Sequence, residues 1–233
     1  MLFRSESITR KGHERVLRAR LEDALFFFES DKNRPLDDLI PELKGSIFQA
    51  QLGTMYEKSE RLVKLTRTLA EMLEPEKVED ACRAAQLCKT DLLTDMVGEF
   101  PSLQGIMGHA YADLAGEKEE IARAIREHYM PIRAGAQVPT QSLGALVGLA
   151  DRIDTLAGCF GINEIPTGTA DPFGLRRISL AIIHIIEDFQ YQLSLREVIH
   201  KALALYGERV DGGSTTVDSV LGFVKERFRN DCV

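Results

Sequence analysis

Apolar residues recur along this chain at spacings of three and four, which is the period of one face of an α-helix. Few runs alternate apolar and polar residues as half-buried strands do. Four stripes carry the helical pattern, the last of them after a glycine-containing loop at residues 207–214. The stripes are Val16, Leu17, Leu21, Ala24, Leu25 and Phe28; Leu62, Leu65, Leu69, Met72 and Leu73; Ile121, Ala124, Ile125 and His128; and Val217, Val220, Leu221, Val224 and Phe228. The pattern predicts an all-α protein built as a multi-helix bundle.

Capping chemistry marks where two of these helices begin. Asp171 followed by Pro172 is typical of an N-cap carboxylate with proline at the first helical position. Ser194 and Glu197 have the spacing of a capping box. We therefore expect one helix to begin at Pro172 and another directly after Ser194.

Composition and charge narrow the class of protein. With 44% hydrophobic residues, the 233-residue chain can bury a large core. Acidic residues exceed basic ones by 36 to 29, so the net charge of -7 argues against nonspecific binding of nucleic acid. The apolar stretches are shorter than the roughly 20 residues of a membrane-spanning helix, and the charged N-terminus is not typical of a signal peptide. These features predict a cytoplasmic protein whose nucleic-acid contacts, if it makes any, lie on a local basic face.

A first group of acidic residues could bind a divalent cation. Asp91 and Asp95 are four residues apart on one face of a predicted helix, and Glu99 continues that face. His109 follows nearby, after two glycines. A solvated helix face and a hydrogen-bonded structural histidine explain the same residues without a ligand.

A second acidic pair, Asp151 and Asp154, follows an apolar helical stretch at three-residue spacing. Ion pairs with Arg152, Arg176 or Arg177 would explain this pair without any catalytic role. The two arginines at 176 and 177 also follow a predicted helix start, where guanidinium groups can receive phosphate. Both interpretations of these arginines stay open at this point.

Five segments, in order along nearly the whole chain, resemble the beta subunit of bacterial heterotetrameric glycyl-tRNA synthetase. They are ARLEDALFFFESD (19–31), FQAQLGTMYEKSERL (48–62), CKTDLLTDMVGEFPSLQGIMGHAYA (88–112), LADRIDTLAGCFGI (149–162) and DPFGLRR (171–177). In that family the alpha subunit holds the class II active site for glycine and ATP, and the beta subunit contributes tRNA recognition. The resemblance implies that this chain is part of a glycine–tRNA ligase.

The resemblance further implies partners and an order of parts. The expected partners are the alpha subunit and tRNA(Gly), with no membrane and no DNA, and ATP is used only through the alpha subunit. Alone, the chain is expected to be inactive, with no catalytic residue and no cofactor of its own. Residues 1–45 would form the helical end of the family's body region, and residues 46–233 an HD-like helical domain with its following helices. The family's C-terminal anticodon-binding domain is expected to lie outside this sequence.

The family's middle region is similar to HD-type metal phosphohydrolases, in which a His-Asp doublet follows an apolar helix and a later Asp completes the metal site. Cys88 and Lys89 occupy the places of the doublet here, and Asp151 corresponds to the later Asp. One retained carboxylate makes a poor metal site, because affinity depends on the number and geometry of ligands. The resemblance therefore implies a degenerate, metal-free and noncatalytic HD domain.

Three functions follow from these observations. In the first, the chain helps to hold tRNA, and the candidate contacts to backbone phosphate are Lys89, Arg152, Arg176 and Arg177. In the second, it is a metal-dependent HD-type phosphohydrolase that uses Asp91, Asp95, His109 and Asp151 as ligands. In the third, it is a structural connector that binds no tRNA even at low salt.

Overall fold

The computed structural model describes residues 2–133 and 135–231, and within them the chain is almost entirely helical. The eleven α-helices of this part are α1 (Leu2–Asp31), α2 (Leu36–Glu42), α3 (Met55–Leu73), α4 (Val78–Leu87), α5 (Asp95–Glu99), α6 (Ile106–Leu114), α7 (Glu119–Glu127), α8 (Ser142–Gly161), α9 (Leu175–Asp188), α10 (Leu195–Leu205) and α11 (Ser214–Asp231). The prediction of an all-α, multi-helix bundle is confirmed. The sequence pattern did not predict a short antiparallel ribbon of β1 (Ile47–Gln49) and β2 (Gly53–Thr54).

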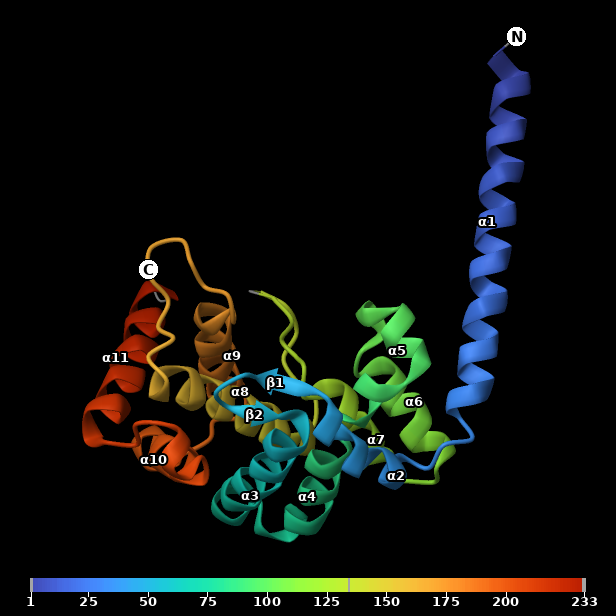
Figure 1. Cartoon of the computed structure of the whole chain (residues 1–233). Coiled ribbons are helices and arrows are strands. Elements are labelled where there is room, and N and C mark those ends of the chain that lie inside the picture. The colour runs from blue at the N-terminus through green and yellow to red at the C-terminus, as the bar shows by residue number, and fades with distance from the viewer. Residues whose placement is uncertain (1, 134, 232–233) are drawn as a thin grey trace.

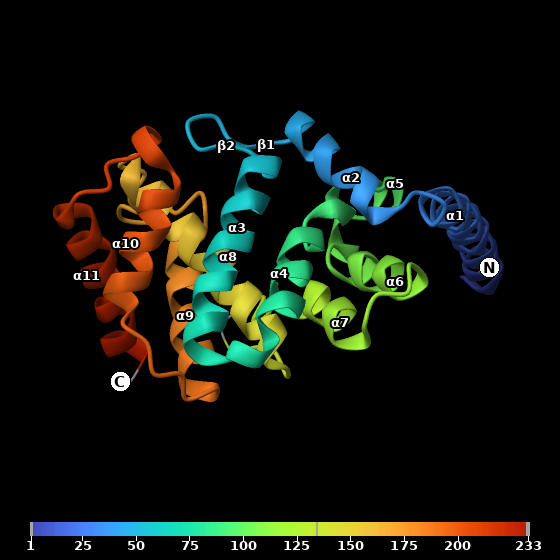
Figure 2. The same cartoon turned by 90° about the horizontal axis from the view of Figure 1, so that it is seen from below.

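Helix α8 forms the centre of the bundle and contacts α3, α7, α9 and α10 (Figures 1 and 2). Its first part, from Leu143 to Ala150, is buried on every side, as expected for a helix that is apolar all round. Charged residues interrupt that apolar character in its second part. Among the described residues, no helix combines the length and the apolar character that crossing a membrane requires.

Helix α1 projects from the body as a long rod (Figure 1). Four apolar side chains of its predicted stripe, Val16, Leu17, Leu21 and Leu25, are each more than 60% exposed. The C-terminal end of α1 packs on the body, where the Phe28 ring stacks 5.8 Å from the ring of Tyr111. The helical period therefore identified the face correctly, but the body does not cover most of it.

The two predicted helix starts have different outcomes. Ser194 caps α10 as predicted, since its hydroxyl accepts a hydrogen bond from the Glu197 amide, but the return bond from the Ser194 amide to the Glu197 carboxylate that completes a capping box is not among the contacts of the described residues. The start at Pro172 is wrong, because a turn closed by Gly174 N to Asp171 O (3.1 Å) precedes α9. Asp171 still caps the helix from that turn, where its carboxylate accepts from the amides of Leu175 (2.7 Å) and Arg176 (3.0 Å).

Candidate functional site

Two carboxylates in the second part of α8 face a group of cations from α3 and from the end of α4. Lys58 Nζ lies 2.8 Å from Asp151 Oδ1 and 3.0 Å from Asp154 Oδ2, so it bridges the two acids. Lys89 Nζ lies 2.7 Å from the other oxygen of Asp151, Oδ2. Arg61 Nε lies 2.7 Å from the other oxygen of Asp154, Oδ1. The sequence-based expectation that arginines 152, 176 or 177 pair with these acids is wrong, because the partners come from other helices.

The network is buried except for Asp151, whose side chain is 16% exposed, and its ionised state is stabilised from several sides. Burial alone would raise the pKa of Asp151, but the ammonium groups of Lys58 and Lys89 hold it well below its usual range. Asp154 is completely buried and also accepts a hydrogen bond from the Tyr206 hydroxyl at 3.0 Å. Charges removed from water in this way are tolerated only when such partners surround them.

The ammonium group of Lys89 is held by three different kinds of partner. Besides Asp151, it donates to His128 Nε2 at 2.9 Å and lies 4.3 Å from the centre of the Tyr129 ring. His128 Nδ1 lies 2.6 Å from the Ile125 carbonyl oxygen, so the ring proton belongs on Nδ1 and Nε2 is free to accept. Burial and the neighbouring Lys89 hold the pKa of His128 well below its usual value. The imidazole is therefore neutral in the folded protein.

The residues at the HD-like positions do not fit a divalent metal ion. Asp151 and His128 offer ligand types that metals favour, but both contact the Lys89 ammonium instead. The Cys88 thiol is buried and donates to the Ala85 carbonyl oxygen at 3.2 Å, and burial raises its pKa to about 12, which disfavours the thiolate that binds metals. Across the described residues, no three His, Cys, Asp or Glu side chains are grouped as a metal site would need.

The acidic residues of the first group also lie apart from one another. Asp91 belongs to a 3₁₀ turn at Thr90–Leu93, whereas Asp95 begins α5, so the expected common helix face does not form. Asp91 is buried, and its Oδ2 accepts from the amides of Gly105 (2.6 Å) and Gly108 (3.2 Å). Asp91 thus anchors the start of α6.

His109 has a separate partner on the same helix. Its Nε2 lies 3.0 Å from Asp113 Oδ2, one turn further along α6. The alternative metal set of Asp91, Asp95, His109 and Asp151 is therefore not brought together.

Of the four candidate phosphate contacts, Lys89 and Arg152 are buried inside the protein. The Arg152 guanidinium donates to the carbonyl oxygens of His128 (2.7 Å), Gly148 (2.9 Å) and Met130 (2.7 Å), among others. Burial lowers the pKa of Arg152 to about 10, so it stays charged at neutral pH. Its observed role is to hold the chain segment that follows α7 against α8, and burial argues against direct contact of either residue with a nucleic-acid backbone.

The two arginines at the start of α9 differ from each other. Arg176 donates to the carbonyl oxygen of Gly168 at 2.9 Å and also lies near that of Ala170, so its guanidinium lies against the preceding loop. Arg177 is exposed, and among the described residues its side chain makes no hydrogen bond or ion pair. Gly174 leaves room for it, because a Cβ there would lie 3.0 Å from Arg177 Nη2. Arg177 is the candidate that remains available to a ligand.

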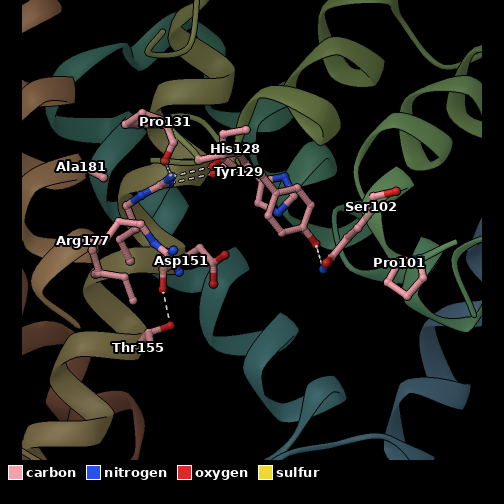
Figure 3. Close-up of a pocket in the computed structure, with 13 residues that line it drawn as sticks. Pro101, Ser102, His128, Tyr129, Pro131, Asp151, Thr155, Arg177 and Ala181 are labelled. Carbon is pink, nitrogen blue, oxygen red and sulfur yellow. Dashed lines mark hydrogen bonds between the residues drawn. The ribbon is translucent and has the colours of Figure 1, made fainter. Parts of the chain in front are cut away.

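A cavity of about 370 Å³ lies over the buried network (Figure 3). Arg177, Asp151 and Thr155 stand on one wall of it, and Pro101 and Ser102 stand across from them. This volume is within the range of small-molecule sites, roughly 300–1,000 Å³.

Sequence reasoning missed four residues of the network: Lys58, Arg61, His128 as a polar partner, and Tyr206. A signal for two of them was present, because Lys58 and Arg61 lie seven and four residues before Leu65 and so continue its apolar face. Cations on a face that is otherwise apolar indicate buried acidic partners. Tyr206, at the end of α10, carries no comparable local signal.

Comparison with known proteins gives a consistent result over nearly the whole chain. A family model described as glycyl-tRNA synthetase beta subunit matches residues 3–232. The chain is 48% identical over 230 residues to the glycine–tRNA ligase beta subunit of Geobacter metallireducens, covering 98% of this chain and 34% of that protein. It is 49% identical to that of Geobacter sulfurreducens and 47% identical to that of Trichlorobacter lovleyi, each with the same coverage. The chain thus spans about one third of the length of these relatives.

Proposed function

Because the chain belongs to the glycyl-tRNA synthetase beta subunit family, we propose that it contributes to glycyl-tRNA synthesis as one part of a glycine–tRNA ligase. In this proposal it helps to hold tRNA(Gly) in the cytoplasm, and a separate alpha subunit activates glycine with ATP and transfers it. The family match over residues 3–232 supports the general role.

The chemistry of the buried network supports a noncatalytic part in that reaction. Asp151, the retained acidic residue of the HD-like site, has both carboxylate oxygens bound to ammonium groups. Ammonium groups on both oxygens lower the basicity of this carboxylate and repel a metal cation, so it is a poor general base and a poor metal ligand. The buried Cys88 thiol, with a pKa of about 12, is a poor nucleophile at neutral pH. Another subunit would therefore have to supply the reacting groups.

Arg177 is the observation that carries the tRNA-binding part of the proposal. In a protein of net charge -7 it is an exposed cation at the wall of a cavity, with no acidic partner among the described residues. Backbone phosphates are recognised by unpaired cations of this kind.

A titration with tRNA(Gly) at low and at physiological salt, together with the metal content after gentle dialysis, tests the proposal. We expect binding that weakens as salt increases, without stoichiometric metal. Tightly bound metal with no affinity for tRNA would instead support a phosphohydrolase. Absence of tRNA binding even at low salt would support a structural connector.

A further inference from the structure

The cavity beside α8 lies in a region of excess positive charge. Arg152 and Arg177 line it, and Lys58 and Lys89 form ion pairs with Asp151 in its wall. Asp151 is the only acidic residue among those that line the cavity, and two ammonium groups already pair with it. An anion entering the cavity would therefore meet a net positive field.

The cations nearest the cavity have no carboxylate of their own. Arg152 donates its hydrogen bonds to backbone carbonyl oxygens, and Arg152 and Arg177 both line the cavity. An exposed guanidinium such as that of Arg177, which forms no ion pair among the described residues, favours a ligand with concentrated negative charge, as on phosphate.

Beside the polar side chains of Ser102, Gln104 and Thr155, the cavity wall has an apolar part that suits a different portion of the ligand. Its apolar lining comes from Pro101, Pro131, Ile132, Ile178 and Ala181. Tyr129 contributes an aromatic ring, held in place by the hydrogen bond from Gln104 Nε2 to its hydroxyl at 2.7 Å. Apolar and aromatic walls of this kind accept the flat faces of bases.

We propose that this cavity binds one nucleotide unit, with its phosphate at Arg177 and its base and sugar against the apolar wall (Figure 3). The inference rests on the proposed function only for the source of the nucleotide, which is an unpaired residue of bound RNA. A free mononucleotide has the same chemistry, and the experiment separates the two.

The test measures binding of AMP and of adenosine to the 233-residue chain at low salt, by equilibrium dialysis. AMP is expected to bind at least about tenfold more tightly than adenosine, because a charge-assisted hydrogen bond to phosphate is lost without it. Arg177→Ala should remove this difference. Arg176→Ala is the matched control, since it deletes the neighbouring arginine whose guanidinium lies against loop carbonyl oxygens.

A second variant tests the apolar wall. Ile132 is 66% exposed and lines the cavity, so Ile132→Ser removes apolar contact area without opening the core. This variant should bind AMP and adenosine severalfold more weakly than the parent protein, by similar factors for the two ligands. Circular dichroism verifies that each variant is folded.

The proposal is overturned if AMP shows no saturable binding at millimolar concentration, if adenosine binds as well as AMP, or if the two arginine variants behave alike. Displacement of AMP by a short single-stranded RNA supports RNA as the source, and AMP binding that RNA does not displace supports a free nucleotide in the same cavity. If tRNA(Gly) binds but AMP does not, the cavity assignment fails while the proposed function stands. If AMP binding depends on Arg177 but tRNA does not bind, the proposed function fails and the cavity assignment stands.

Discussion

At the scale of single residues, the centre of the protein depends on sharing charge among a few side chains. Lys58 forms ion pairs with both acids of α8. Lys89 forms an ion pair with Asp151 and donates a hydrogen bond to His128. Removing one member of such a network leaves other groups buried without a partner, and this costs more than the lost contact alone. Stability should therefore be sensitive to single substitutions here.

Lys89→Met tests this sensitivity. The change leaves Asp151 with one ammonium partner and His128 Nε2 with no donor among the contacts observed, so we expect the free energy of unfolding to fall by about 3 kcal/mol. Urea denaturation measures it. The control is Lys118→Met, which breaks the exposed pair with Asp80 (2.7 Å) and should change stability little. Equal effects of the two variants would show that the buried network is not stabilising.

His128 should make stability depend on pH in the mildly acidic range. Its folded-state pKa lies well below 6.5, so below that pH the unfolded chain binds a proton that the folded protein does not. The contribution of neutral His128 to the free energy of unfolding is complete above pH 6.5. It is lost as pH falls toward the folded-state pKa, by up to about 1.4 kcal/mol per pH unit. Denaturant titrations at a series of pH values should give a flatter profile for His128→Asn. His13→Asn, on an exposed part of α1, should keep the parent slope, and identical slopes for both variants would contradict the assignment.

At the scale of elements, α1 is joined to the body through its last residue. The Asp31 carboxylate accepts from the amides of Asp95 and Met96, both at 2.9 Å, and from the Tyr111 hydroxyl at 3.0 Å. Asp31 therefore ends one helix and caps the start of α5. Arg20 adds an exposed ion pair to Glu99 at 2.6 Å. The N-terminal half of α1 has no comparable contacts to the body among the described residues.

Amide hydrogen exchange should separate the two halves of α1. Helices without tertiary packing are marginal in water, so we expect residues 10–19 to exchange fast and the last turn before Asp31 to be protected. The amides of α8 are the internal reference, because that helix is central and should open only on global unfolding. Exchange in residues 10–19 as slow as in α8 would show that something covers the apolar stripe.

At the scale of the whole molecule, net charge and local charge have opposite signs. The chain carries -7 overall, yet the surroundings of the cavity are positive. Such a distribution limits the number of phosphate contacts that a bound RNA can make with this chain. Salt screens the long-range repulsion from the acidic surface, and it also screens the attraction of phosphate to an exposed cation such as Arg177.

The salt dependence of tRNA binding should reflect this small number of contacts. A plot of the logarithm of the binding constant against that of salt concentration should have a shallow slope, because each neutralised phosphate adds slightly less than one to it. Arg177→Ala should reduce the slope by about one. Arg176→Ala should stay close to the parent protein. An unchanged slope for Arg177→Ala would show that Arg177 does not contact a phosphate of the bound tRNA.

Local spacing and capping chemistry in the sequence were sufficient to predict the helical fold class and several helix faces, because both depend on residues within one or two turns, but they did not predict the break between Asp91 and Asp95. The all-α fold, the cap at Ser194 and the capping carboxylate of Asp171 were predictable in this way. The displaced start of α9 was not, since a turn ending in Gly174 at φ 66° also satisfies that carboxylate.

Only the tertiary structure decided which charges meet and which apolar faces are covered. Lys58 and Asp151 are 93 residues apart, and the packing of α3 on α8 brings them together. Arg152 follows Asp151 directly in sequence but points elsewhere, because successive side chains on a helix diverge by about 100°. The exposed stripe of α1 has the same period as the buried stripe of α3. The sequence by itself determines which residues share a face, whereas burial depends on whether another element packs against that face.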